Sequence, residues 1–577
     1  GSTDKTGHFR VIFVGTNQGL LHAFGEVSWS TTVTNTANVS VAVTRGVVDE
    51  LWAFAPTDII SYIDYFRVPG AKHRFSVDGP PTVYLLDRPQ DATQATGNGK
   101  YDVSTYAPER ATLVFGLGKG GRSYYAINIA DPGVPAMQWS LCPDEPNSYS
   151  SRNKSGLSTT PIANMGLSTC TPSIARVATS REGKTNQIVD VVLLGGGYSD
   201  TNIEAALPGS PAGPALNTRL GRSALAIEVT SGDILGIWDT STDSGAGPVP
   251  SGLIPHELTQ GTGINQRAYF TDTYGGLWAL GSTTMQTNPT GKTGYTNFRL
   301  DTSVIDAWST VPRLVYRQQV AAFAAGNGLA TTMPVPFNIP FFPVVRTSDP
   351  KIQPGAVGIA MVTGDRNNPL DDITYTAWSK PTQHRLNVLF DRQDVNTTIT
   401  DTGLQDAGGT SFSIDPSSTS YYLANSAGYF INFPSLSSNG GTFIPKGIVS
   451  PLVLDGALFY SYFNPTTSSC AGGTGTTETF RVCNVMKPVV NAASSWGSAD
   501  ASSVTAINGC QSGRIISWTG VASMLALRSI LAGVQAGMTG GSGINVNASQ
   551  PQNLLLQDLT RQGSSVYAKV RVWRTIH

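Results

Sequence analysis

Short apolar stretches alternate with glycine-containing turns along most of the chain. In residues 11–24, 113–129 and 269–280, a run of β-branched or apolar residues is followed by a Gly, Asp or Asn turn and a second apolar run with an aromatic residue. This pattern is typical of a β-hairpin. Weaker copies lie at 191–194 with 224–229, at 357–362 with 374–378, and at 452–463. The pattern predicts an all-β protein with a few short helices.

Repeated hairpins need neighbours that cover both faces of each sheet. Four-stranded sheets packed radially supply this cover and leave only short edges exposed. We therefore expect a modified β-propeller of roughly six to eight blades with long loops between the blades. A pair of β-sandwiches is the alternative, because hairpin periodicity alone does not distinguish a ring of sheets from two sheets packed face to face.

The low charge content and the short apolar runs argue against nucleic acid and membrane lipid as partners. Only 13% of the 577 residues are charged, and the formal net charge is -1. Nucleic acid is not expected as a partner, because no basic stripe is present to neutralise phosphates. A membrane span is not expected either, since the most apolar run, residues 521–534, is short and contains Arg528.

The cysteines predict two local disulfides. Five cysteines are present, without a CxxC pair or a neighbouring His at the spacing of a zinc site. Cys142 and Cys170 bracket a polar insertion, and Cys470 and Cys483 bracket a stretch rich in Gly and Thr. A bridge within each pair is expected of a protein that works outside the cytoplasm. Cys510 is then left over, as a buried free thiol.

Several longer motifs resemble one family. They occupy residues 10–24, 50–56, 77–83, 116–132, 272–278, 428–434 and 450–459, and the chain ends with Val572-Trp-Arg574. In this order, and nearly from end to end, the chain resembles the C-terminal domain of the PilC/PilY family of type IV pilus biogenesis proteins. The resemblance implies a modified propeller, export through the periplasm, and a place at the cell surface or pilus tip. It also implies contact with minor pilins and adhesion to a host or abiotic surface.

The same resemblance sets the expected domain organisation. Residues 1–3 have the composition of a cloning remnant, and residues 4–577 are expected to form one propeller domain. Family members commonly carry an N-terminal region similar to a von Willebrand factor A domain, so this chain is expected to be the C-terminal part of a longer protein. The role implied for it is regulation of pilus extension and retraction, and hence of twitching motility.

One family feature is expected to be missing. Many relatives place a calcium loop of alternating Asp residues just ahead of the strand leading to residues 272–278. The stretch from Leu258 to Gln266 stands there instead and contains no carboxylate. Calcium needs several oxygen ligands, usually including charged ones. We therefore predict that the calcium site is lost and that the chain holds no metal there.

A second oxygen-rich loop is a weaker candidate for a cation. It contains Asp365, Asn367, Asp371 and Asp372, but Pro369 and the irregular spacing do not fit an EF-hand. A solvated turn in which the Asp residues cap backbone N–H groups is the alternative.

The sequence predicts no catalytic residue and no cofactor. Gly116, Gly118 and Gly121 satisfy GxGxxG, yet a strand pattern follows them where a dinucleotide site requires a helix. A quinoprotein-like propeller enzyme remains an alternative, although the vicinal Cys-Cys pair general in that class is absent from the sequence. A carbohydrate-binding propeller is another alternative. The main hypothesis is a non-enzymatic protein that acts through its surface loops.

Overall fold

The computed structural model describes most of the first 320 residues and the strands of the later part. The described residues are 11–34, 40–70, 73–86, 110–131, 133–181, 185–199, 220–243, 246–258, 262–273, 275–287, 296–318, 342–346, 357–364, 384–406, 427–433, 436–438, 441–443, 445–447, 450–454, 457–464, 475–482 and 513–519.

The first three sheets are antiparallel and follow one another along the chain. The first sheet contains β1 (Val11–Gly15), β2 (Leu21–Thr34) and β3 (Ser40–Phe54). The second contains β4 (Thr82–Leu86), β5 (Arg110–Gly116), β6 (Tyr124–Asn128) and β7 (Ala136–Leu141). The third contains β8 (Ser173–Thr179), β9 (Gln187–Gly195), β10 (Ser223–Glu228) and β11 (Ile234–Asp239).

Three further sheets continue this series. The fourth contains β12 (Ile254–His256), β13 (Arg267–Thr271), β14 (Gly276–Leu280) and β17 (Arg313–Arg317). The fifth contains β18 (Phe342–Arg346), β19 (Val357–Val362), β20 (Arg385–Asp391), β22 (Gly428–Asn432) and β21 (Gln405–Asp406), with β21 parallel to β22. The sixth contains β25 (Leu452–Leu454), β26 (Ala457–Asn464), β27 (Thr476–Val482) and β28 (Gly513–Thr519).

Small hairpins and short helices fill the connections between sheets. The hairpins are β15 (Met285–Thr287) with β16 (Asn297–Arg299), and β23 (Leu436–Ser438) with β24 (Gly441–Phe443). The α-helices are α1 (Thr57–Ile60), α2 (Asn147–Ser150) and α3 (Thr160–Ala163), and the 3-10 helices are η1 (Ile63–Arg67), η2 (Gly118–Gly120), η3 (Ile305–Ala307) and η4 (Asp401–Gly403). Among the described residues, no helix has both the length and the apolar composition needed to cross a bilayer.

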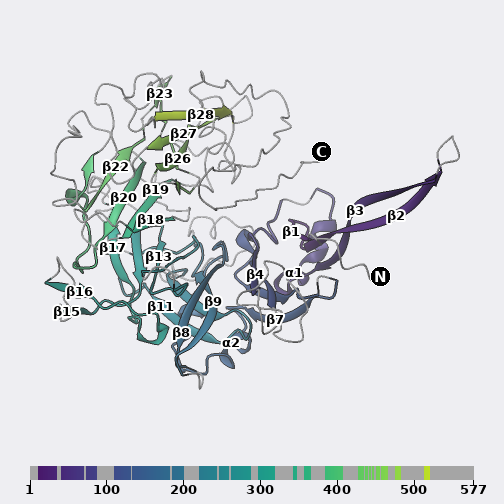
Figure 1. Ribbon diagram of the computed structural model, residues 1–577, viewed down its shortest axis with the longest axis horizontal. Helices are drawn as coiled ribbons and strands as arrows, with labels where there is room; N and C mark the ends of the chain where they lie inside the picture. The colour runs from purple at the N-terminus through teal and green to yellow at the C-terminus, as the bar shows by residue number, and fades with distance from the viewer. Residues whose placement is uncertain are drawn as a thin grey trace.

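The sheets are arranged as the blades of a propeller. The first strands of neighbouring sheets pack beside one another, β8 with β12, β12 with β18, and β18 with β25. Figure 1 shows the second to sixth sheets following one another along a curved path. The predicted all-β propeller with a few short helices is confirmed, in preference to two face-packed sheets. Within the described ranges, six sheets have three or more strands.

The hairpins that the sequence pattern predicts are present, and each pairs two strands that are adjacent in the sequence. Strands β1 and β2 pair Val11 with Gly25, strands β5 and β6 pair Phe115 with Tyr125, and strands β13 and β14 pair Phe270 with Trp278. The pairing predicted between residues 357–362 and 374–378 differs in the structure. Residues 357–362 form β19, which pairs with β20. Residues 374–378 lie outside the described residues.

The first sheet extends away from the rest of the molecule. Strands β2 and β3 pair over fourteen positions, from Leu21 with Phe54 to Thr34 with Ser40, whereas β1 covers only the first part of β2. Figure 1 shows these two strands projecting as a long ribbon from the body of the protein.

The glycine-rich segment between β5 and β6 serves close packing. Gly118 has φ of +60°, and a Cβ on Gly120 would lie 1.8 Å from the backbone oxygen of Ser76. Only the three-residue helix η2 lies between the strands, and β6 follows directly. The GxGxxG glycines therefore form a tight turn, as the strand pattern after them predicted.

The disulfide predicted between Cys142 and Cys170 is not formed. Both residues are buried free thiols. Cys142 follows β7 and packs in the core cluster with Leu117 and Tyr125, whereas Cys170 lies in the larger core cluster with Val192 and Leu194. The polar insertion between them carries α2 and α3, which already pack Tyr149 and Ile162 into the core. Hydrophobic burial thus holds this segment without a covalent bridge.

Candidate functional site

The stretch predicted to have lost its calcium ligands is closed by its own side chains. Glu257, one position before the stretch, accepts hydrogen bonds at Oε1 from the Thr262 hydroxyl and the Gly263 backbone N–H, each at 2.9 Å. Gln266 Oε1 accepts the Leu258 backbone N–H at 2.6 Å. Side chains of the loop and of Glu257 therefore satisfy several of its backbone donors, and the Asn265 N–H donates to the Arg176 backbone oxygen of β8 at 2.7 Å. Residues 259–261 lie outside the described residues.

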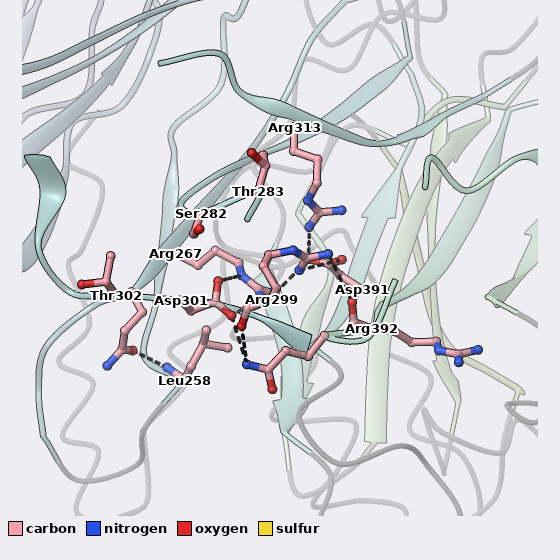
Figure 2. Close-up of polar contacts among 12 residues, drawn as sticks. Leu258, Arg267, Ser282, Thr283, Arg299, Asp301, Thr302, Arg313, Asp391 and Arg392 are labelled. Carbon is pink, nitrogen blue, oxygen red and sulfur yellow. Dashed lines mark hydrogen bonds and ion pairs between the residues drawn. The ribbon is translucent and has the colours of Figure 1, made fainter. Parts of the chain in front are cut away.

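The loop leads directly into a buried ionic network. Arg267, the first residue of β13, donates from Nε and Nη2 to the two oxygens of Asp301 at 3.1 and 2.6 Å. Its Nη1 reaches Asp391 Oδ2, at the end of β20, at 2.9 Å. Figure 2 shows the Arg267 guanidinium between the two carboxylates. The network therefore joins the fourth sheet to the fifth.

Two more arginines surround Asp391. Arg313, at the start of β17, donates from Nη2 to Asp391 Oδ2 at 2.6 Å. The hydroxyl of Tyr269 donates to the same oxygen at 2.7 Å. Arg299, at the end of β16, places Nη1 3.6 Å from Asp391 Oδ1. We call Arg267, Arg299, Asp301, Arg313 and Asp391 the arginine network; none of the five side chains is more than 8% exposed.

Burial and mutual attraction set the charge states of the network. Burial by itself would raise the pKa of Asp391, but the guanidinium groups of Arg313, Arg267 and Arg299 outweigh that effect and hold this pKa well below its ordinary value. Burial lowers the pKa of Arg299 to about 10, because Asp391 only partly offsets the desolvation and the other two arginines repel it. Asp391 and Arg299 are therefore both charged at neutral pH.

In this arrangement the Arg267 guanidinium is the cation that binds the two carboxylates, and its role is structural. Two carboxylates from different segments face one guanidinium, which donates in a bidentate fork to Asp301. Within the described ranges, no three His, Cys, Asp or Glu side chains gather as a set that could hold a metal ion. The arginine network thus places buried positive charge directly after the loop of residues 258–266.

A second feature lies on the surface near α1 and η1. Arg74 lies over the ring of Tyr62, with its guanidinium carbon 3.6 Å from the ring centroid, and Lys119 lies 4.9 Å from the ring centroid of Phe75. Tyr65 and Phe66 continue the rings, with centroids 6.0 Å apart. We call these six residues the aromatic–cation patch. Its four rings are half-buried and Arg74 is exposed, so both cations and ring edges are accessible to a partner.

Several sequence candidates fall outside the described residues. These are the weak cation candidates Asp365, Asn367, Asp371 and Asp372, the cysteines Cys470, Cys483 and Cys510, and the apolar run 521–534. Sequence reasoning did not find the arginine network. The available signal was the presence of Arg267 and Arg313 beside apolar strand cores in a chain with few charges.

Parts of the chain are similar in sequence to known pilus proteins. No family model matches the chain. A type IV pilus biogenesis factor PilY1 homolog of Xylella fastidiosa is 27% identical over 123 residues, which is 21% of this chain and 6% of that protein. The type IV pilus biogenesis factor PilY1 of Pseudomonas aeruginosa is 25% identical over 273 residues, which is 46% of this chain and 16% of that protein. The matched stretch thus spans about a sixth of the longer-matching relative.

A solved structure gives a further comparison. The crystal structure of the Pseudomonas aeruginosa PilY1 C-terminal domain aligns over 89% of this chain and 87% of that domain. The sequence identity is 16% and the TM-score is 0.48.

Proposed function

We propose that this chain is a PilY1-like type IV pilus protein, as its similarity to PilY1 suggests, and that it is a non-enzymatic, pilus-associated surface module. It acts in pilus biogenesis through contacts made by its loops, at the pilus tip and with minor pilins. The 25% identity with PilY1 over 273 residues carries this proposal. Residues 4–577 then form one propeller domain at the C-terminal end of a longer, exported protein.

The blade architecture supports a surface role. Antiparallel sheets bury their apolar faces against one another, and the described core clusters run from sheet to sheet. Packed sheets of this kind hold their connecting loops in fixed positions. Such loops are suited to binding pilus subunits or a foreign surface, and they need no reactive group for it.

The aromatic–cation patch is our candidate for an adhesive contact. Arg74 and Lys119 lie against aromatic rings, and Arg74 has an exposed guanidinium end. Cations held over the faces of aromatic rings can pair with anionic ligands such as acidic sugars. This observation also favours the carbohydrate-binding alternative, in which the ligand is a surface polysaccharide.

Control of pilus extension and retraction is proposed to be independent of calcium in this protein. Glu257 and Gln266 close the loop with internal hydrogen bonds, and Arg267 engages the nearby carboxylates. Calcium usually requires several charged oxygen ligands, and no three His, Cys, Asp or Glu side chains gather among these described residues.

A complementation experiment tests the proposal. The gene that encodes this chain is deleted, and pilus number, twitching motility and attachment to glass or host cells are measured. Deletion is expected to lower all three, and the wild-type gene to restore them. The double variant Arg74→Ala, Lys119→Ala is expected to restore pili but not attachment. The control Lys154→Ala removes an exposed cation that pairs with Asp233 and should restore both. Unchanged pilus number after deletion would contradict the proposal.

A further inference from the structure

The first sheet has one strand fewer than the sheets built from the same sequence pattern. The hairpins β1–β2, β5–β6 and β13–β14 are copies of that pattern. In the second and fourth sheets, the first strand of the copy has a further neighbour, because β4 pairs antiparallel with β5 and β12 with β13. Among the described residues, β1 pairs only with β2. The difference between the sheets therefore lies at the free edge of β1.

Strand β1 is also exposed where its counterparts are buried. Every residue of β13 is buried, and so is every residue of β5 except Arg110. No residue of β1 is buried, although its sequence Val-Ile-Phe-Val-Gly is just as apolar, and Val14 is 40% exposed. An apolar strand at an open edge leaves both side chains and backbone hydrogen-bonding groups facing solvent. The composition of β1 is thus that of a strand with a neighbour on both sides.

A second exposed apolar surface lies on β4. The first sheet covers one face of β5, where Leu113 and Phe115 lie in one core cluster with Phe13 of β1. Val83 and Leu85 of β4 lie on the same face of the second sheet, since Val83 pairs with Leu113. These two side chains are nevertheless 42% and 57% exposed. One more strand beside β1 would extend the first sheet over them.

A segment late in the sequence, outside the described residues, has the pattern that this position requires. Residues 566–572 read Val-Tyr-Ala-Lys-Val-Arg-Val, with an apolar residue at every second position and Gly-Ser-Ser just before them. Strand β8, the first of the third sheet, is also seven residues long and contains Ala175-Arg-Val177, with the two apolar side chains buried and the arginine exposed. Ala568-Lys-Val570 repeats that order. Residues 1–10, by contrast, have Phe9 as their only apolar residue.

We propose that residues 566–572 pair antiparallel with β1 and complete a four-stranded first sheet. The alternating apolar residues of this segment then face β4 and cover Val83 and Leu85, whereas Lys569 and Arg571 lie on the opposite face of the strand. A segment that follows the sixth sheet is thereby joined to the first sheet, which closes the ring of sheets. The same strand supports the base of the projecting β2–β3 ribbon. This closure is separate from the proposed pilus function.

A photo-crosslink identifies what covers β4. The crosslinking amino acid p-benzoylphenylalanine replaces Leu85 in the purified chain, and the irradiated product is digested and analysed by mass spectrometry. We expect crosslinks within one chain to residues 562–574. The same amino acid at Val134, which is 71% exposed just before β7 at the other edge of this sheet, should not reach them. Crosslinks from position 85 to a second copy of the chain, or none to residues 562–574, would overturn the proposal.

Hydrogen exchange tests the same contact through β1. Val570→Asp places a charge on the apolar face of the segment and should raise the exchange rates of the β1 amides about tenfold or more, while those of β19 stay unchanged. Lys569→Gln is the matched control on the opposite face and should change the rates less than about twofold. Equal β1 rates in Val570→Asp and the wild type would contradict the closure. If Val570→Asp does not fold, the crosslink from position 85 decides.

Discussion

The indole Nε1 of Trp278 donates a hydrogen bond to Asp272 Oδ2 at 2.7 Å, across the turn between β13 and β14. The other oxygen of Asp272 accepts the Gly276 backbone N–H at 2.8 Å. Burial raises the pKa of Asp272, while these hydrogen bonds oppose the rise. In the segment from Asp272 to Trp278, a buried carboxylate thus ties the turn to the strand.

We predict a large loss of stability when the indole N–H of Trp278, which donates to Asp272, is removed. Trp278→Phe keeps an aromatic ring but leaves the buried Asp272 carboxylate short of a donor. We expect a loss of about 1.5–3 kcal/mol in the free energy of unfolding, measured with urea. Trp139→Phe is the matched control, because Trp139 Nε1 donates to the neutral oxygen of Val229 at 2.8 Å. It should lose about 1 kcal/mol. Equal losses would show that the charge of Asp272 contributes nothing.

The arginine network predicts strong dependence on Asp391. Asp391→Asn removes the charge that faces Arg267, Arg299 and Arg313, and should cost about 3–5 kcal/mol in the free energy of unfolding. Asp394→Asn breaks a pair nearer the surface, with Arg392, and should cost less than about 1 kcal/mol. Chemical denaturation of both variants measures the difference. A small loss for Asp391→Asn would contradict the role of the network as a junction between sheets.

Features formed by residues close in sequence could be predicted from the sequence, whereas features formed by residues far apart in the chain could not. The hairpins depend on neighbours in the chain, so periodicity and turn residues predicted them, but they did not predict the hydrogen bond from Trp278 to Asp272. The arginine network joins Arg267 to Asp391, 124 positions apart, and no local pattern carries that information. The aromatic–cation patch likewise needs Lys119 to meet Phe75. Cys142 and Cys170 are near in sequence but lie in different core clusters, and spacing alone suggested a bridge.

Because Glu257 closes the loop of residues 258–266, we predict that calcium does not change the thermal stability of the protein. Because Glu257 already accepts the Gly263 N–H, millimolar CaCl2 and EDTA should give the wild type the same thermal midpoint. Glu257→Ala removes the loop's own acceptor and should lower the midpoint in both conditions. Differential scanning calorimetry measures both effects. A higher midpoint in CaCl2 that EDTA reverses would show that the loop binds the ion after all.

Burial of His384 predicts that the protein loses part of its folding stability at acid pH. Burial, helped by Lys446, lowers the pKa of His384 to about 3, and its Nδ1 lies 3.2 Å from the Thr363 hydroxyl. The unfolded chain protonates this residue below about pH 6.5, whereas the folded chain does so only near pH 3. Its contribution to stability is therefore complete above pH 6.5 and declines as the pH falls toward 3.

The variant His384→Gln isolates this contribution. Between pH 7 and pH 5, the wild type should lose about 2 kcal/mol more unfolding free energy than the variant. Urea titrations of both proteins at the two pH values give the difference directly. Parallel losses would mean that His384 is protonated in the folded state.

Localisation of the protein tests the central claim most directly. Pili are sheared from living cells, and the pilus, envelope and cytosolic fractions are probed with an antibody raised against this chain. We predict that the protein appears with sheared pili and in the envelope, and that it leaves the pilus fraction when the major pilin gene is deleted. A protein found only in the cytosol would contradict the assignment to the pilus.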